Sequence, residues 1–210
     1  MGRNLKIFTI NPKNPEPGLI TRAVEIAGKA VPFIFPTDTV YGIGIAVVSD
    51  SSLEPLYAIK ERDWDKAIPW LVSGVRDLEI YGAEVPDYAL KLAEKHWPGA
   101  LTLIVKASDA VPEKFRATDG SIALRVPNCK IALAMIEELG APLATSSANL
   151  QGKEPPRCFR AIDTALMRQV ELVIDGGECP KWLSSTIVSC LGEEPQIVRL
   201  GALSEAELRQ

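Results

Sequence analysis

Apolar residues recur along the chain with two different spacings, and segments of the two kinds alternate. Short runs rich in β-branched and aromatic residues are typical of buried strands. Runs with apolar residues three and four positions apart are typical of amphipathic helices. The first pattern predicts strands at 6–10, 31–35, 41–48, 68–72, 101–106, 121–126, 142–145, 172–175, 186–190 and 197–200. The second predicts helices at 17–29, 51–61, 87–96, 130–139 and 161–168.

Residues with strong backbone preferences mark several of the predicted helix ends. Ser51 or Ser52 can cap a helix, and Glu54 is placed to reinforce that cap. Pro98 ends the helix before it, because proline disfavours helical geometry in the preceding residue. Gly140 follows the last apolar position of another helix, as is typical of a helix C-terminus.

The alternation of strands and helices indicates an α/β fold. Segments 33–35 and 41–47 resemble the neighbouring strands of a hairpin, so we expect a mixed sheet and not a purely parallel one. No repeat, low-complexity tract or obvious linker divides the chain. A single domain over residues 1–210 is therefore the simplest organisation.

The composition is that of a globular protein, with 47% hydrophobic and 24% charged residues. Four well-separated cysteines and one histidine, His96, argue against a zinc cluster and against a histidine-activated nucleophile. No signal peptide is recognisable and the apolar runs are too short to span a bilayer, so we expect a cytoplasmic protein. The net charge of −4 argues against a dedicated nucleic-acid-binding protein but permits a local basic cleft.

Three polar segments lie where predicted strands and helices end. Residues 36–42 place two hydroxyls and a carboxylate between apolar strands, and residues 145–149 place three hydroxyls and an amide after one. Such loops suit phosphate or carboxylate oxygens. Each segment also reads as an ordinary turn, polar loop or solvated helix end. The third polar segment lies at the end of the helix predicted at 51–61, and its basic residues are Lys60, Arg62 and Lys66.

Two further features lie on predicted strands. Arg125 stands among apolar residues of the strand 121–126, so it needs a partner if it is buried. Residues 184–186 bring hydroxyls to the start of another strand, and Arg199 lies near the end of the next. The chain has no Walker loop, and residues 42–44 lack the third glycine of a dinucleotide-binding fingerprint.

Taken in order, these pieces resemble the motifs of the YrdC-like family, the threonylcarbamoyl-AMP synthases. The family pattern is P-T-[DE]-T-x-Y-G, then K-x-R, an S/T-x-x-x-R strand, S-A-N, S-T-[IV] and R-x-G. Each motif is weak alone, but six in one order at compatible spacing cover nearly the whole chain. They fall here at 36–42, 60–62, 121–125, 147–149, 185–187 and 199–201.

The resemblance implies a twisted, mixed α/β open sheet flanked by helices, like that of YrdC and DHBP synthase, with a concave basic cavity. It also implies that L-threonine and bicarbonate or CO2 form N-carboxythreonine, whose carboxylate attacks the α-phosphate of ATP. Pyrophosphate leaves, with Mg²⁺ expected on the phosphates and no side chain assigned as a metal ligand. A partner transferase complex then moves the threonylcarbamoyl group to adenosine 37 of tRNA.

The resemblance also implies roles for individual residues. A cleft of cations and hydroxyls suits phosphoryl-type transfer, which depends on positioning and on countering charge. Lys60 and Arg62 are the implied catalytic pair. By motif position, threonine is held by Thr39, Arg125, Thr145 and Ser185. The implied ATP contacts are Lys60, Arg62, Lys66, Ser121, Ser147, Asn149 and Arg199.

Three observations limit the resemblance. Many long members carry a histidine where Leu71 stands, so one threonine contact is expected to differ. The chain continues only briefly after 199–201, as in short single-domain members. Residues 10–15 resemble those of a paralogous branch that departs from the family at K-x-R and S-A-N. The alternatives are a YrdC-fold protein that binds nucleotide, tRNA or double-stranded RNA without synthase activity, and a serine or cysteine hydrolase.

Overall fold

The computed structural model describes residues 5–49, 51–60 and 68–209. Its strands are β1 (Lys6–Thr9), β2 (Phe33–Phe35), β3 (Gly42–Ala46), β4 (Trp70–Leu71), β5 (Leu101–Lys106), β6 (Ser121–Arg125), β7 (Leu143–Ser147), β8 (Leu172–Asp175), β9 (Thr186–Ser189) and β10 (Gln196–Arg199). Its α-helices are α1 (Pro17–Ala27), α2 (Glu54–Lys60), α3 (Arg76–Tyr81), α4 (Asp87–His96), α5 (Lys130–Leu139), α6 (Thr164–Met167) and α7 (Glu205–Arg209). Two short 3-10 helices are η1 (Glu113–Phe115) and η2 (Phe159–Ala161).

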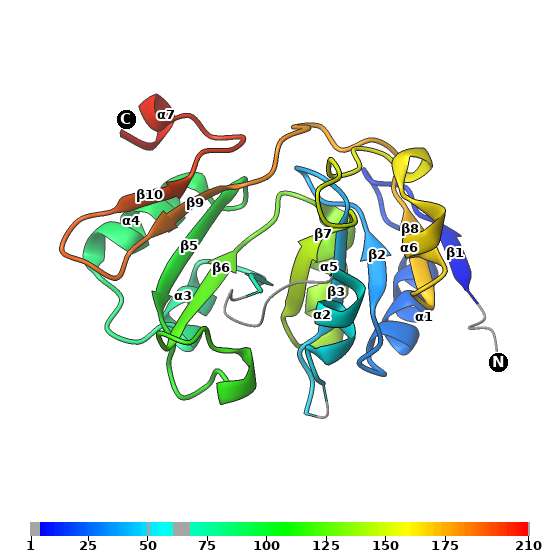
Figure 1. The fold of residues 1–210 in the computed structure, drawn as a ribbon, viewed down its shortest axis with the longest axis horizontal. Helices are drawn as coiled ribbons and strands as arrows, with labels where there is room; N and C mark the ends of the chain where they lie inside the picture. Colours follow the sequence, from blue (N-terminus) through cyan, green and yellow to red (C-terminus); the bar gives the residue numbers. More distant parts are fainter. Residues whose placement is uncertain (1–4, 50, 61–67, 210) are drawn as a thin grey trace.

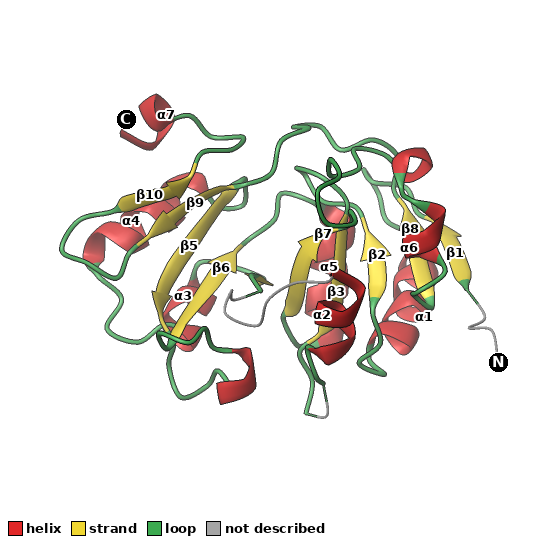
Figure 2. Cartoon of the chain, viewed as in Figure 1, coloured by secondary structure: helices red, strands yellow, loops and turns green. Residues whose placement is uncertain are grey.

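The ten described strands form one sheet, in the order β1-β8-β2-β3-β7-β4-β6-β5-β9-β10. Four neighbouring pairs are parallel, namely β1–β8, β2–β8, β4–β6 and β5–β9. The remaining pairs, including the β2–β3 hairpin, are antiparallel. The prediction of a mixed sheet with helices against it is confirmed (Figures 1 and 2).

Two apolar clusters hold the helices to the sheet. In one, α1 and α5 pack through Ile20 and Ile131 against strand residues such as Phe33. In the other, α2 and α3 contribute Leu56 and Leu78, and α4 also takes part. Burying a large aliphatic side chain stabilises the fold by about 1.5–3 kcal/mol. Helices α1, α2, α4 and α5 are therefore fixed by the apolar faces that the sequence pattern indicated.

Strand β4 connects the two halves of the sheet and contains only two residues. It pairs with β7 on one side and with β6 on the other. Its Trp70 is buried and packs edge-on against Tyr81 and Phe115, with ring centroids 5.3 and 5.4 Å away. Aromatic packing thus supports a joint that has few backbone hydrogen bonds.

Several elements occur where the sequence pattern placed them. Helices α4 and α5 match 87–96 and 130–139, and strands β5 and β8 match 101–106 and 172–175. Gly140 ends α5 with φ of 61°, a left-handed conformation that favours glycine. The predicted strand 68–72 is shorter in the structure, where only β4 is a strand.

The predictions for the strand at 142–145 and for the helix at 161–168 were wrong. The strand predicted at 142–145 continues to Ser147, because Ser147 pairs with Gly42 of β3. The hydroxyls of residues 145–147 therefore stand on a strand and not in a loop. In place of the helix predicted at 161–168, the structure has η2 and the short helix α6, whose first turn is capped by the Asp163 side chain.

Helices α3 and α7 were not predicted, and in each a carboxylate of the first turn accepts hydrogen bonds from residues that precede the helix. The Asp77 carboxylate accepts hydrogen bonds from the backbone and hydroxyl of Ser73 and from Gly74 N. Glu207 and Ser204 make reciprocal contacts of the same kind at the start of α7. In α7 the Ser204 hydroxyl also accepts from Glu207 N, as in a capping box. Each helix is too short for a clear apolar period.

The composition-based expectations concern cysteines, metals and membranes. All four cysteines are free thiols, and burial raises the pKa of Cys179 and of Cys190 to about 12. Among the residues that the structure describes, no group of three His, Cys, Asp or Glu side chains is arranged to hold a metal ion. In the same residues, no helix combines the length and apolar character needed to cross a membrane.

Candidate functional site

A cavity of about 940 Å³ opens on one face of the sheet. It brings together the loop before β3, the end of α2 and residues of β5, β6, β7, β9 and β10. Asn149 lies beside this cavity, hydrogen-bonded to Lys60. Arg62 and Lys66, which the sequence also indicated, lie outside the described residues. The predicted site residues that line the cavity are Thr39, Lys60, Ser121, Arg125, Thr145, Ser147, Ser185 and Arg199.

The cavity exists because one face of the central strands carries small or polar side chains. On β6, alternate residues Ser121, Ala123 and Arg125 face the cavity, while Ile122 and Leu124 face the apolar cluster behind the sheet. This alternation follows from the two-residue period of a strand. The sheet therefore has an apolar rear face and a hydrophilic hollow on its front.

Two glycines of β3 make room for the side chains of the neighbouring strand. Gly44 pairs with Thr145, and Gly42 pairs with Ser147. A Cβ on Gly42 would lie 2.7 Å from Thr145 Cγ2, and one on Gly44 would lie 2.9 Å from Thr145 Oγ1. The glycines are thus needed for close approach, and they leave the β7 hydroxyls open to the cavity.

Arg125 is the most constrained cation of the cavity. Its Nε donates to Gly99 O at 2.8 Å, its Nη1 to Thr39 Oγ1 at 3.0 Å and its Nη2 to Asp38 Oδ1 at 2.5 Å. The ion pair is buried, with exposed side-chain fractions of 7% for Arg125 and 2% for Asp38. Of the five N–H groups of a guanidinium, two remain for a ligand once these three bonds are counted.

The turn before β3 combines an ordinary turn with a functional arrangement. Thr37 Oγ1 donates to Val40 O and accepts from Thr39 N and Val40 N, so this threonine satisfies the local backbone. The side chains of Thr39 and Asp38 are therefore not needed to satisfy the turn backbone, and both accept hydrogen bonds from Arg125. The turn interpretation of the segment is confirmed for Thr37, and the ligand-site interpretation stays a prediction.

Lys60 holds the end of β7 in place. It is buried at the end of α2, and its Nζ donates to Ser147 O at 2.7 Å and to Asn149 Oδ1 at 3.0 Å. It also donates to the backbone oxygen of Asn149. The sequence predicted Lys60 as a contact of an anionic ligand. That contact stays a prediction, and what the structure shows is that Lys60 donates to the Ser147–Asn149 segment.

The last two sequence motifs, at 185–187 and 199–201, contact each other. Arg199 donates from Nη2 to Ser185 O at 2.8 Å and from Nε to the same oxygen at 3.3 Å. Thr186 Oγ1 accepts from Gly201 N at 2.9 Å and donates to Leu203 O at 2.6 Å. The segment after β10 is therefore fixed against the start of β9, which places Arg199 at the cavity.

Gly201→Ala is expected to destabilise this contact. A Cβ at position 201 would lie 2.1 Å from Ser184 O, a backbone atom that cannot move cheaply. We expect a loss of about 1–3 kcal/mol in the free energy of unfolding, as for overpacking, measured by urea denaturation. Gly192→Ala is the control, because the nearest atom to its Cβ is 3.8 Å away. Equal stability of the two variants would show that the 201–203 segment is not held as described.

Tyr41 ties the cavity to the loop after β8. Its hydroxyl donates to Gly177 O at 2.8 Å and accepts from Gly176 N at 3.1 Å. Burial is the main reason that the pKa of this phenol is raised well above its usual value. Tyr41 therefore stays a neutral hydrogen-bonding group under ordinary conditions.

Sequence reasoning missed three residues of this network. Asp38 was noted only as part of a turn, Thr102 was not noted, and Tyr41 was seen only as a motif position. The alternation along β5 could have indicated Thr102, because it is a hydroxyl in an otherwise apolar strand. The pairing of Asp38 with Arg125 joins residues far apart in the sequence, so no local pattern reports it.

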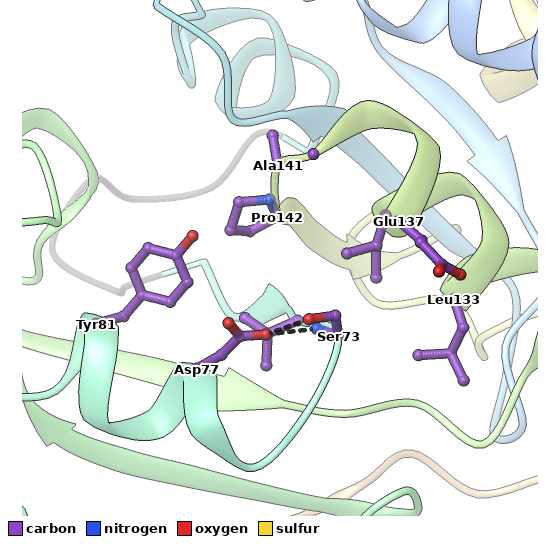
Figure 3. A pocket seen from close by; sticks show the side chains of 10 residues that line it. Ser73, Asp77, Tyr81, Leu133, Glu137, Ala141 and Pro142 are labelled. Carbon is purple, nitrogen blue, oxygen red and sulfur yellow. Dashed lines mark hydrogen bonds between the residues drawn. The ribbon is translucent and has the colours of Figure 1, made fainter.

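A second cavity of about 520 Å³ lies between α3 and α5. Figure 3 shows Asp77 and Ser73 joined by hydrogen bonds on one side and Glu137 and Pro142 on the other. The Asp77 carboxylate already accepts hydrogen bonds from the backbone of Ser73 and Gly74. This cavity contains none of the residues that the sequence motifs indicated.

Comparison with known proteins agrees with this architecture. The family model Sua5_yciO_yrdC, described as telomere recombination, matches residues 27–201. The threonylcarbamoyl-AMP synthase of Pyrococcus abyssi is 32% identical over 84% of this chain and 52% of its own length. The synthase of Bacillus subtilis is 30% identical over 97% of this chain and 57% of its own length. The chain thus spans about half the length of these two relatives.

Two solved structures are closely similar. Sua5 of P. abyssi complexed with L-threonine gives a TM-score of 0.90 at 30% identity, over 97% of this chain and 60% of that chain. YciO of Escherichia coli gives a TM-score of 0.85 at 29% identity, over 94% of this chain and 96% of that chain. The predicted fold, a twisted and mixed α/β open sheet flanked by helices, is confirmed by these similarities.

Proposed function

This chain belongs to the Sua5/YciO/YrdC family, whose model matches residues 27–201, and on that premise we propose that it is a threonylcarbamoyl-AMP synthase. The observation that carries the proposal is the single cavity in which residues of six separate motifs meet. Its cations and hydroxyls suit a small anionic amino acid beside a triphosphate. A relative from P. abyssi has been solved with L-threonine.

The threonine subsite of the proposal centres on Arg125. Two of its N–H groups are available for the substrate carboxylate, and planar guanidinium groups suit carboxylates. The Asp38 contact fixes the guanidinium before substrate binds. Thr39, Thr145 and Ser185 supply hydroxyls around it. Leu71 pairs with Arg125 in the neighbouring strand, so this side of the subsite is apolar.

The electrostatics of the cavity favour carboxylation of the amine. Nearby cations disfavour the protonated form of an amine and attract bicarbonate. In the proposed step the neutral amine of threonine attacks CO2, forms the new N–C bond and loses a proton. The product is a carbamate, which is an anionic oxygen nucleophile held among Lys60, Arg125 and Arg199.

The second proposed step is transfer of the adenylyl group. A carbamate oxygen bonds to the α-phosphorus of ATP while the bond to the β-phosphate oxygen breaks, and pyrophosphate leaves. Lys60 and Arg199 counter the charge that develops, and Ser121, Ser147 and Asn149 orient the nucleotide. Arg62 and Lys66 enter the proposal from their motif positions alone. In this proposal Mg²⁺ is carried by the triphosphate.

The product of this reaction is a mixed anhydride, which is reactive toward amines. We therefore propose that a transferase complex takes it up and modifies adenosine 37 of tRNA. This step belongs to the cytoplasm, where ATP and tRNA are both available.

The test is to incubate the protein with ATP, L-threonine, bicarbonate and Mg²⁺. We expect pyrophosphate release that depends on threonine and on bicarbonate, together with threonylcarbamoyl-AMP detected by mass spectrometry. D-threonine serves as the control, because it has the same charges in the wrong arrangement. Folded protein that produces neither compound would exclude the synthase.

A second candidate is a nucleotide- or RNA-binding protein without synthase activity. Its basis is that the family is not restricted to chains named as synthases: YciO of E. coli, named only as an uncharacterized protein, is 30% identical over 93% of this chain and 95% of its own length. Tight, salt-dependent binding of tRNA or double-stranded RNA, with no turnover of threonine, would favour this candidate over the synthase.

A further inference from the structure

Thr102 lies on β5, one of the strands that line the cavity. It pairs with Ile187 of β9 on one side. On the other side it lies one residue from the Leu103–Leu124 pair, which places it beside Arg125 of β6. Its side chain lines the cavity although the residue is only 1% exposed. It therefore stands between the two guanidinium groups of the site, those of Arg125 and Arg199.

The hydroxyl of Thr102 has one hydrogen-bond partner in the described part of the chain, Ser185 Oγ at 2.8 Å. A hydroxyl carries one proton to donate and two lone pairs. If Ser185 donated in this pair, the proton of Thr102 would have no acceptor at a nearly inaccessible position. Burying an unsatisfied donor costs free energy. Satisfying both hydroxyls therefore requires Thr102 to be the donor and Ser185 the acceptor of this hydrogen bond.

Ser185 receives a second donor from Arg199, whose Nη2 lies 3.4 Å from Ser185 Oγ. With both lone pairs directed at Thr102 and Arg199, the proton of Ser185 is left for a group inside the cavity. That group must be an acceptor, because a donor such as an ammonium would face another proton. Ser185 thereby distinguishes the oxygen end of a ligand from its amine.

We propose that Thr102 is a positioning residue, which sets the Ser185 hydroxyl as a donor toward an anionic oxygen of the ligand. The inference rests on the proposed function and goes one step further, since it assigns the chemistry of one contact. The anionic oxygen belongs either to the carboxylate of threonine or to a phosphate of ATP. Because Arg199 touches the same serine, the contact also links the two substrates.

The test compares Thr102→Val, which keeps the shape and removes the hydroxyl, with Thr102→Ser, which keeps the hydroxyl. Dissociation constants are measured by calorimetry for L-threonine alone and for a non-hydrolysable ATP analogue alone. We expect Thr102→Val to weaken one of the two ligands about tenfold, the effect of one hydrogen bond to a charged group. Thr102→Ser should restore that affinity to within about threefold. If only the affinity for threonine falls, the oxygen that accepts from Ser185 belongs to the threonine carboxylate. If only the affinity for the ATP analogue falls, that oxygen belongs to a phosphate.

Thr21→Val is the matched control, because Thr21 is exposed on α1 and bonds only to the helix backbone at Pro17. The proposal is overturned if Thr102→Val binds both ligands like the wild type. Equal weakening of both ligands with a lowered Tm, not rescued by Thr102→Ser, would also overturn it in favour of a packing role. Wild-type protein that binds neither ligand would defeat the proposed function itself, and this inference with it.

Discussion

Replacing Lys60 by methionine is expected to lower threonine-dependent pyrophosphate release at least about 100-fold, the cost of removing a charge-stabilising group from a reaction centre. Two effects combine in this loss. The cavity loses a cation near the transferred phosphate, and the oxygens of Ser147 and Asn149 lose their common donor. Methionine fills the same space, so the fold is expected to survive. The measurement is the initial rate at saturating ATP and threonine.

Lys91→Met is the matched control for this prediction. Lys91 is exposed on α4, away from the cavity lining, and its replacement should leave the rate within about twofold, as expected for a surface substitution. Circular dichroism and Tm of both variants check that folding is intact. Wild-type turnover in Lys60→Met would mean that Lys60 is only a solvated or structural helix end.

Asp38→Ala is expected to lower the free energy of unfolding by about 3–5 kcal/mol, the usual cost of leaving one partner of a buried ion pair alone. The reason is that Arg125 would keep its charge at a site that is almost closed to water. Asn128 N would also lose its acceptor, Asp38 Oδ1. Urea denaturation monitored by tryptophan fluorescence gives the quantity directly.

The exposed ion pair between Asp109 and Arg116 provides the comparison. Its atoms are 3.7 Å apart and Asp109 is fully exposed, so Asp109→Ala should change stability by less than about 0.5 kcal/mol. The double variant Asp38→Ala with Arg125→Met should recover much of the loss, because it removes the unpaired charge. If Asp38→Ala were as stable as Asp109→Ala, the buried pair would contribute nothing measurable.

The sequence identified those parts of the fold that local chemistry decides. The period of α5 and its terminal Gly140 are both local, and the helix ends where they indicate. Strand β7 was predicted too short, because its last residues are polar and become a strand only through pairing with the glycines of β3. Pairing across the sheet is not encoded within any one segment.

The candidate site shows the same division. The order of the motifs grouped Thr39, Lys60, Arg125 and Ser185 correctly around one cavity, although no single motif was specific. What each side chain contacts was beyond reach of the sequence. Asp38, the ionic partner of Arg125, is 87 residues away, and Lys60 contacts oxygens of Ser147 and Asn149, which are similarly distant in the sequence. Such contacts depend on strand order, which only the folded sheet defines.

The two-residue strand β4 has a mechanical consequence. Bending resistance in a sheet comes from its ladder of hydrogen bonds, and β4 contributes only two residue pairs to each of its neighbours, β7 and β6. Thr145 lies on one side of that joint and Arg125 on the other. A slight flexing there would narrow or widen the hollow while each half stays rigid. Any such flexing would shift Thr145 relative to Arg125, because these two cavity residues lie on opposite sides of β4.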